Sequence, residues 1–341
     1  MSFGDNQGPL RLYTTMRRIR SFEERVGELF VRGESAGSML HLSIGEESVA
    51  GVCAAMTEGD TFTTHHRGHG IFIARGADPK RMMSEIAGKA DGYCHGKGGS
   101  MHIADMGLGH LGANAIVGGG IPHIIGAGLA YRNRGEGRVS VAFFGDGAMQ
   151  QGILYESMNM AALWKLPVVF CCINNQYGMG TRVDRSAGRL AFDERARAFG
   201  LDGVVVDGLD VEAVNAAAAG IVDGARNGRP GFISLEVFRF FGHARMDKSP
   251  YRSEEEEKAG RAKDPVLFTR GSLAARGIAD AATLDGIDAD VAAEMDAALE
   301  HAVKAAPPAL DIMFDDVYGP GEPRPTPVRS RIADILSEAR A

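Results

Sequence analysis

The chain has 341 residues, of which 45% are hydrophobic and 24% charged, and its formal net charge at pH 7 is −7. This length allows one large α/β domain or two ordinary ones, and the composition is that of a globular protein with a well-filled core. The negative charge argues against a general binder of nucleic acids or anionic membranes, although it leaves room for a local basic pocket that holds a phosphate.

The first third of the chain predicts two helices and then a long irregular segment. Apolar residues recur at helical spacing from 10 to 32, and a second helix is expected over 46–56. Residues 88–120 contain eleven glycines and show no periodicity. An irregular segment of this length is usually functional or disordered when it lies inside a compact domain, so we expect a long loop there.

Beyond residue 120, predicted strands and helices alternate. The expected strands are 139–144, 167–173, 204–206 and 232–237, and the expected helices are 126–131, 149–164 and 211–226. Such alternation predicts a parallel sheet that helices cover on both faces. The predicted fold class is therefore α/β, with a doubly wound parallel sheet.

The C-terminal part of the chain is more polar. We expect helices over 265–276 and 288–304, and an apolar run at 310–318 precedes a proline-rich stretch. The four consecutive glutamates at 254–257 predict the solvated start of a helix, because carboxylates are favourable in the first helical turn.

No internal repeat and no clear linker divides the sequence. We therefore expect a single domain over 1–341, with a helical N-terminal arm at 1–35 and a helical C-terminal extension at 253–341.

The cysteines and the N-terminus suggest a cellular compartment. The four cysteines form no C-x-x-C pair, which indicates buried free thiols in a reducing environment. They are Cys53, Cys94, Cys171 and Cys172. The N-terminus lacks the apolar region of a signal peptide, and no apolar stretch is long enough for a membrane span. We expect a cytoplasmic protein.

Two short polar sequence motifs follow the predicted strands 139–144 and 167–173. The first is GDG, with Asp146 between two glycines, and the second is NN, which ends at Asn175. Ligands bind at the carboxyl ends of strands in doubly wound folds, and Mg²⁺ prefers oxygen ligands. Asp146, the side-chain oxygen of Asn175 and a carbonyl at Tyr177 would supply such a set. Taken singly each word is more often a turn, but together, at two strand ends separated by one helix and one strand, they predict a metal site.

Histidines gather in the segment THHRGHG, residues 64–70. Arg67 lies next to a glycine and can present two donors to a phosphate. The competing interpretation is a zinc cluster of His65, His66 and His69, although the segment lacks an H-E-x-x-H motif.

Three further patterns carry less information. His41 and His243 are isolated, and a lone histidine is more often structural than catalytic. The glycines at 107, 109 and 112 spell a dinucleotide fingerprint, but no clear strand precedes them and no clear helix follows. We therefore expect no nicotinamide cofactor.

The GDG and NN words, at this spacing, are similar to the diphosphate and magnesium signature of thiamine-diphosphate enzymes. The flanking words HRGHG, GKGGSMH, ANAIVGGGIP, MNMAALWKLPVVF and NNQYGMGT resemble the alpha subunit of the decarboxylating component of 2-oxo acid dehydrogenase complexes. The resemblance covers residues 10 to 320 and lies on the pyruvate and acetoin side of the family. It implies that thiamine diphosphate and Mg²⁺ are the cofactors.

The resemblance also implies roles for individual residues. Arg67 would bind the terminal phosphate, with His66 and His69 beside the cofactor, and His69 would be a catalytic residue together with His41 and His243. His41 would meet the substrate, and His243 would contact both cofactor and reacting groups. The remaining cofactor contacts would come from Ala115 and Val117, through their backbone to the aminopyrimidine ring, and from Asp146, Gly147, Ala148 and Asn175 to the diphosphate. The family often has tyrosine in place of His66 and glycine in place of Ala115.

In this family the glutamate that activates the cofactor belongs to a beta subunit, so the resemblance implies an α2β2 assembly that transfers an acyl group to a lipoyl-bearing acyltransferase. It implies no nucleic-acid or membrane partner. The substrate would be pyruvate, with acetoin as the alternative. Two other classes stay open from the residues alone, a histidine- or zinc-dependent hydrolase and a non-catalytic assembly subunit.

Overall fold

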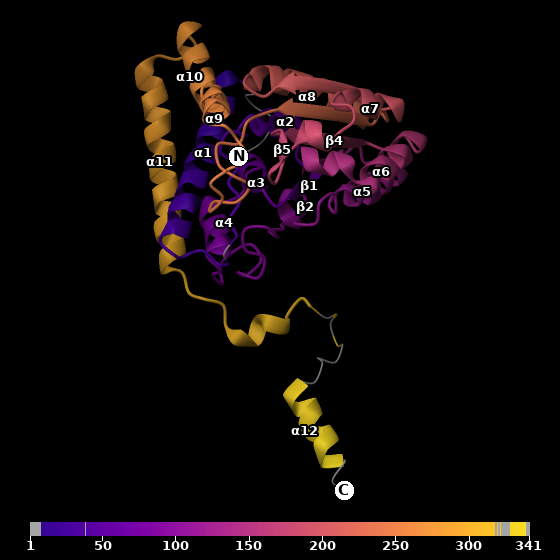
Figure 1. Cartoon of the computed structure of the whole chain (residues 1–341), viewed down its shortest axis with the longest axis vertical. Coiled ribbons are helices and arrows are strands. Elements are labelled where there is room, and N and C mark those ends of the chain that lie inside the picture. Colours follow the sequence, from indigo (N-terminus) through magenta and orange to yellow (C-terminus); the bar gives the residue numbers. More distant parts are fainter. Residues whose placement is uncertain (1–7, 38, 318, 320, 322–327, 339–341) are drawn as a thin grey trace.

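A six-stranded sheet lies at the centre of the computed structural model (Figure 1), which describes residues 8–37, 39–317, 319, 321 and 328–338. The strands are β1 (Thr61–His65), β2 (His110–Asn114), β3 (Ser140–Gly145), β4 (Val168–Asn174), β7 (Asp202–Asp207) and β8 (Gly231–Glu236). Their order is β2-β1-β3-β4-β8-β7, and every neighbouring pair is parallel. All six carboxyl ends therefore meet at one edge.

Helices cover both faces of this sheet. Neighbouring residues of a strand point to opposite faces, so Phe143 packs in one apolar cluster and Phe144 in the other. The helices against the Phe144 face are α5 (Ile121–Arg134), α6 (Gly152–Leu163) and α7 (Phe192–Ala198). Those against the Phe143 face include α2 (Val49–Ala55) and α8 (Val211–Arg226). The predicted fold class is confirmed.

A second layer of helices extends the Phe143 face. The long helix α1 (Pro9–Val31) lies alongside α11 (Ala281–Lys304), as Figure 1 shows. The hydroxyl of Tyr13 donates to Asp288 over 2.8 Å, and Arg18 pairs with Glu294 at 2.7 Å. The remaining helices of this layer are α3 (His69–Ala74), α4 (Pro79–Ile86), α9 (Glu254–Arg261) and α10 (Pro265–Ala275).

Most predicted elements are confirmed, with shifted ends. The predicted helix 211–226 has the bounds of α8, while α11 begins at Ala281 rather than at 288 because Asp280 caps it, accepting from the amide of Thr283. The glutamate run starts α9, and Ser253 is its cap.

The segment 88–120 differs from the expected loop. It contains a short 3-10 helix, η1 (Met106–Leu108), and the edge strand β2, in which only His110 is buried. Small side chains and a single strand neighbour give β2 no apolar alternation, so the pattern could not be recognised. The preceding glycines wrap around the buried Glu85, whose carboxylate accepts backbone N–H groups from Cys94, Gly96, Gly98 and Gly99. After the glycines at 107 and 109 the chain forms β2, and the next helix, α5, begins at Ile121.

Smaller elements complete the chain. They are η2 (Asp146–Gln150), the hairpin β5 (Tyr177–Gly178) with β6 (Thr181–Arg182), η3 (Val183–Arg185), η4 (Leu310–Phe314) and α12 (Val328–Glu338). In Figure 1 α12 lies apart from the helices and the sheet. Residues 1–7 of the predicted arm, and Tyr318 of the predicted apolar run, are outside the described residues. None of the described helices combines the length and the apolar character that a membrane crossing needs.

Candidate functional site

A cavity of about 310 Å³ opens at the carboxyl edge of the sheet. Its lining comes from the carboxyl ends of five of the six strands and from the segments that follow them. The residues are His65 to Arg67 at β1, Asn114 and 116–118 at β2, 144–148 and Gln151 at β3, Asn175 and 177–179 after β4, and Arg239 with His243 after β8. The parallel topology thus gathers residues separated by more than 170 positions around one space.

Asp146 and Asn175 meet in this cavity, as their places at the ends of β3 and β4 predict. Asp146 is 3% exposed and Asn175 7% exposed. The two loops that carry them touch, since a Cβ on Gly147 would lie 3.6 Å from the Cα of Gly178. Burial raises the pKa of Asp146 to about 6. The site therefore holds a carboxylate whose charge lacks the solvation that water would supply.

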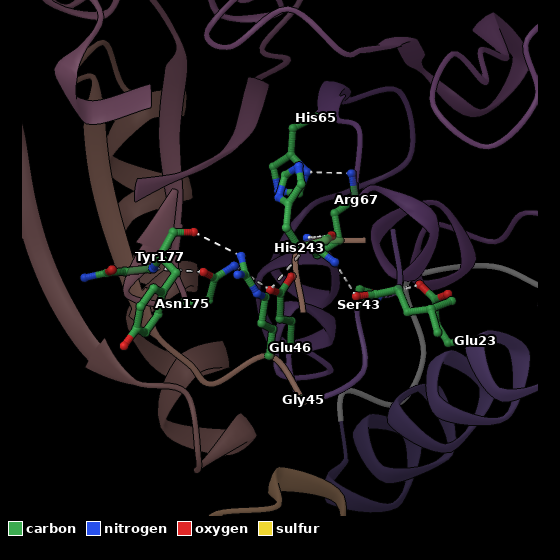
Figure 2. Close-up of polar contacts among 12 residues, drawn as sticks. Glu23, Ser43, Gly45, Glu46, His65, Arg67, Asn175, Tyr177 and His243 are labelled. Carbon is green, nitrogen blue, oxygen red and sulfur yellow. Dashed lines mark hydrogen bonds and ion pairs between the residues drawn. The ribbon is translucent and has the colours of Figure 1, made fainter. Parts of the chain in front are cut away.

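Asn175 is held in one orientation by two hydrogen bonds (Figure 2). Its Nδ2 donates to Oε1 of Glu46 over 2.8 Å, and its Oδ1 accepts from the amide of Tyr177 over 3.2 Å. The carbonyl of Tyr177, the third predicted metal ligand, accepts from Nη1 of Arg239 over 3.1 Å. The carbonyl that is predicted to bind a cation therefore already accepts one hydrogen bond from a positively charged side chain.

Arg239 was not predicted. It is 1% exposed and donates from Nη2 to the carbonyl of Met179 at 2.7 Å and to the hydroxyl of Tyr251 at 2.8 Å. Its Nε is buried without a hydrogen-bond partner among the described residues. The available signal was a single arginine inside the apolar run VFRFF, four residues before His243.

Glu46 was also missed. It is 1% exposed, and its Oε1 lies 3.9 Å from Nε of Arg67, while its Oε2 is buried without a hydrogen-bond partner in the described structure. Burial raises the pKa of this carboxyl. The adjacent Glu47 has a structural role, since it pairs with Arg20 at 2.5 Å. Two acids in an otherwise apolar loop, SIGEE, were the signal that could have marked this position.

Arg67 lines the cavity but already has partners. Its guanidinium donates to the carbonyl of Leu42 over 2.6 Å and to the carbonyl of His243 over 2.7 Å, and the side chain is 3% exposed. Figure 2 shows it between the loop of Ser43 and that of His243. Arg67 thus joins two segments far apart in the sequence and places a positive charge at the cavity.

The histidines separate into two groups. The rings of His41, His66 and His243 lie together, with centroids 4.5 Å (41 to 66), 4.8 Å (41 to 243) and 5.3 Å (66 to 243) apart. His69 lies outside the cavity lining, where its Nδ1 is 3.2 Å from Glu23 and its Nε2 is 2.9 Å from Oγ of Ser100.

The positions of the rings do not support the zinc cluster that the sequence suggests. The predicted trio of His65, His66 and His69 is not gathered, because both ring nitrogens of His69 have other partners. Among the described residues, the acidic, cysteine and histidine side chains close enough to share a metal ion are His41, His66 and His243.

The cavity histidines are electrically neutral at pH 7. Burial lowers the pKa of His41 and His66 to about 2, that of His65 to about 3 and that of His243 to about 4, and the nearby Arg67 acts in the same direction. Positive charge at this edge therefore comes from the arginines.

Of the two residues after β2 that are predicted to contact the cofactor through their backbone, one lines the cavity. Val117 lines the cavity, whereas Ala115 does not, although both its neighbours in the chain, Asn114 and Ile116, do. Ala115 is outside the left-handed region of backbone space, so a side chain there causes no strain.

Comparison with known proteins gives one family and several relatives. The family described as "Dehydrogenase E1 component" matches residues 14–311. The alpha subunit of acetoin:2,6-dichlorophenolindophenol oxidoreductase from Cupriavidus necator is 43% identical over 317 residues, covering 92% of this chain and 95% of the relative. Its counterpart from Bacillus subtilis is 42% identical, covering 91% and 93%. The pyruvate dehydrogenase E1 component subunit alpha from Zymomonas mobilis is 41% identical, covering 92% and 89%.

Proposed function

The chain belongs to the family of the dehydrogenase E1 component, and on that premise we propose that it is the alpha subunit of a thiamine-diphosphate-dependent 2-oxo acid dehydrogenase. In this proposal the enzyme decarboxylates pyruvate and passes the acyl group to a lipoyl-bearing acyltransferase. The likeness to the Zymomonas mobilis pyruvate dehydrogenase subunit supports it. The observation that carries it is the buried carboxylate of Asp146 beside Asn175 in one cavity.

The donor set of the cavity suits a magnesium ion. A cation next to Asp146 would stabilise the ionised carboxylate that burial disfavours. Mg²⁺ takes one or two protein oxygens and leaves its other positions to phosphate and water. The proposed ligands are a carboxylate oxygen of Asp146, Oδ1 of Asn175 and the carbonyl of Tyr177, and Glu46 holds the amide of Asn175 so that Oδ1 faces away from it.

The diphosphate would be held by backbone groups of Gly147 and Ala148 and by the positive charges of Arg67 and Arg239. Guanidinium groups suit phosphate because they offer several donors in one plane. The buried Nε of Arg239, which has no partner among the described residues, is one such donor. His66, Val117 and the backbone near Ala115 would contact the other half of the cofactor.

When bound, thiamine diphosphate supplies a nucleophilic carbon and an electron sink. His41 and His243 are proposed to contact the substrate and the reacting groups, where a neutral imidazole can donate one hydrogen bond and accept another. Nδ1 of His41 is buried without a hydrogen-bond partner in the described structure, which leaves it available. The contacts of His69 with Glu23 and Ser100 favour a positioning role for this residue.

The chain is proposed to need a beta subunit, in an α2β2 assembly. Among the described residues that line the cavity, the single carboxylate is Asp146, which is proposed to bind the metal. A second acid, to activate the cofactor, would come from the partner.

Acetoin cleavage is the second candidate, because two acetoin oxidoreductase alpha subunits are 43% and 42% identical to this chain. Pyruvate carries a carboxylate where acetoin carries a neutral hydroxyethyl group, and part of the pocket that distinguishes them would come from the proposed partner. We propose further that residues 1–35 and 253–341 act as arm and extension of one domain, and that the protein is cytoplasmic, in keeping with its four free cysteines.

Calorimetry tests the cofactor assignment. Thiamine diphosphate should bind the full chain in the presence of Mg²⁺ and weakly in its absence, and Asp146→Ala should abolish the magnesium-dependent part. Asp223→Ala, an exposed acid on α8, is the matched control. Binding that is unchanged by Mg²⁺ or by Asp146→Ala would contradict the proposal.

The reaction is tested by mixing the chain with its beta subunit and assaying pyruvate and acetoin in parallel. Restored turnover of pyruvate supports the leading proposal, and preference for acetoin supports the second. Cofactor binding without turnover of either, in a correctly assembled heterotetramer, would indicate a non-catalytic subunit.

A further inference from the structure

Three histidines from distant parts of the chain face one another beside the cavity. His41 precedes α2, His66 follows β1 and His243 follows β8, and their ligand nitrogens all lie within 4.8 Å of one another. We propose that His41, His66 and His243 form a binding site for a transition-metal ion such as Zn²⁺, separate from the Asp146 position, and that an ion bound there blocks the cavity.

The geometry is close to that of a three-histidine metal site. Zn–N bonds of about 2.0–2.1 Å in a tetrahedral arrangement place the ligand nitrogens about 3.3–3.4 Å apart. The nitrogens must therefore approach one another by up to about 1.5 Å, which ring rotation can supply because His66 and His243 are only partly buried. His41 is 3% exposed, and its buried Nδ1 lacks a hydrogen-bond partner among the described residues. Its lone pair is not otherwise engaged.

The number of ligands also suits a transition metal. Zn²⁺ sites with three protein ligands leave a fourth position for water.

Nearby charges determine which ions can bind. The guanidinium groups of Arg67 and Arg239 oppose any cation, and Glu46, 3.9 Å from Arg67, offsets only part of that charge. Ions that gain little from imidazole nitrogen, such as Mg²⁺ and Ca²⁺, should not overcome this repulsion. Zn²⁺, Cu²⁺, Ni²⁺ and Co²⁺ form strong bonds to imidazole and can.

Occupation has a direct consequence for the cavity. Because His66 and His243 line it, a metal ion and its water would take up space that a cofactor needs. The inference depends on the three rings alone and holds whether or not the chain binds thiamine diphosphate.

Cobalt spectroscopy on the full-length chain tests the site. Co²⁺ should give the visible absorption of a tetrahedral complex in a 1:1 ratio, Zn²⁺ should abolish it, and Mg²⁺ in large excess should not. His66→Tyr and His41→Ala should each weaken Co²⁺ binding about tenfold or more. His123→Ala, an exposed histidine on α5, is the matched control and should bind as the unchanged protein does.

A weak octahedral spectrum, or affinities unaltered in both cluster variants, would overturn the proposal. So would an equal loss in His123→Ala. X-ray absorption of the zinc-loaded, unsubstituted chain needs no variant and covers the case in which the variants do not fold. Three imidazole ligands support the site, and two or fewer refute it. Calorimetry with magnesium and thiamine diphosphate reports on the proposed function separately, since it is carried out without a transition metal.

Discussion

Replacement of Glu23 by alanine tests how the site loops are held. Glu23 lies on α1 and is 0% exposed. Its Oε1 accepts from the amide of Ser43 at 3.0 Å and from the hydroxyl of Ser43 at 2.6 Å, and its Oε2 lies 3.2 Å from Nδ1 of His69. Burial raises the pKa of Glu23, but His69 and Ser43 outweigh burial, so the pKa lies below its ordinary range. One carboxylate thus anchors the loop of His41 and the start of α3.

The size of the effect follows from burial. A buried polar group left without its partner costs about 1–3 kcal/mol. Loss of Glu23 leaves the amide and hydroxyl of Ser43 and Nδ1 of His69 without this partner, so the cost should be about 3–5 kcal/mol, towards the lower end for three groups. Unfolding entropy of about 2.1 cal/mol/K per residue amounts to about 0.7 kcal/mol/K for a chain of this length. Glu23→Ala should therefore lower the melting temperature by about 4–7 °C.

Differential scanning calorimetry of the purified full-length chain measures this change. Glu24→Ala is the matched control, since the neighbouring glutamate on the same helix is exposed, and it should shift the melting temperature by less than about 1 °C. If Glu23→Ala melts within about 1 °C of the unchanged protein, or no lower than Glu24→Ala, the assignment of Glu23 as the anchor is wrong.

Three further predictions address the backbone, the pH dependence and the buried arginine. Gly45→Ala should unfold or severely destabilise the chain, because φ is +97° there and a Cβ would lie 2.0 Å from a backbone oxygen. In Gly126→Ala the added Cβ meets nothing within 4 Å, so urea titration should show the free energy of unfolding raised by up to about 1 kcal/mol. Burial lowers the pKa of His110 to about 3, so as the pH falls below about 6.5 only the unfolded chain takes up a proton at this residue. The free energy of unfolding should therefore fall by up to about 1.4 kcal/mol per pH unit. The decline should be shallower in His110→Asn, and equal declines in the two proteins would refute this. Arg239→Lys keeps the charge but loses at least one hydrogen bond to the carbonyls of residues 177–179. Calorimetry should then show magnesium-dependent binding of thiamine diphosphate weakened about tenfold or more, and an unchanged affinity would argue against Arg239 as a site residue.

The sequence by itself determined the elements whose signals are local. The run from Pro167 to Ile173, and the run from Val139 to Phe144 apart from Ser140, are apolar because helices cover both faces of the sheet, and NN and GDG follow them directly. The helix 211–226 has a cap at Asp210 and an apolar stripe that needs no tertiary information. Since parallel strands share one carboxyl edge, the meeting of Asp146 with Asn175 could be predicted as well.

Only the tertiary structure decided the contacts between segments far apart in the chain. His41 and Glu46 lie on the segment before α2, His66 follows β1, and Arg239 and His243 follow β8. Folding brings these segments together, and no periodicity encodes such contacts. His69 carries the same local signal as His66, yet one faces Glu23 in the interior and the other faces the cavity. Local patterns record which face of a helix or strand avoids water. Which buried polar groups become partners depends on the desolvation penalty that each must offset, and that is determined only when the whole chain has packed.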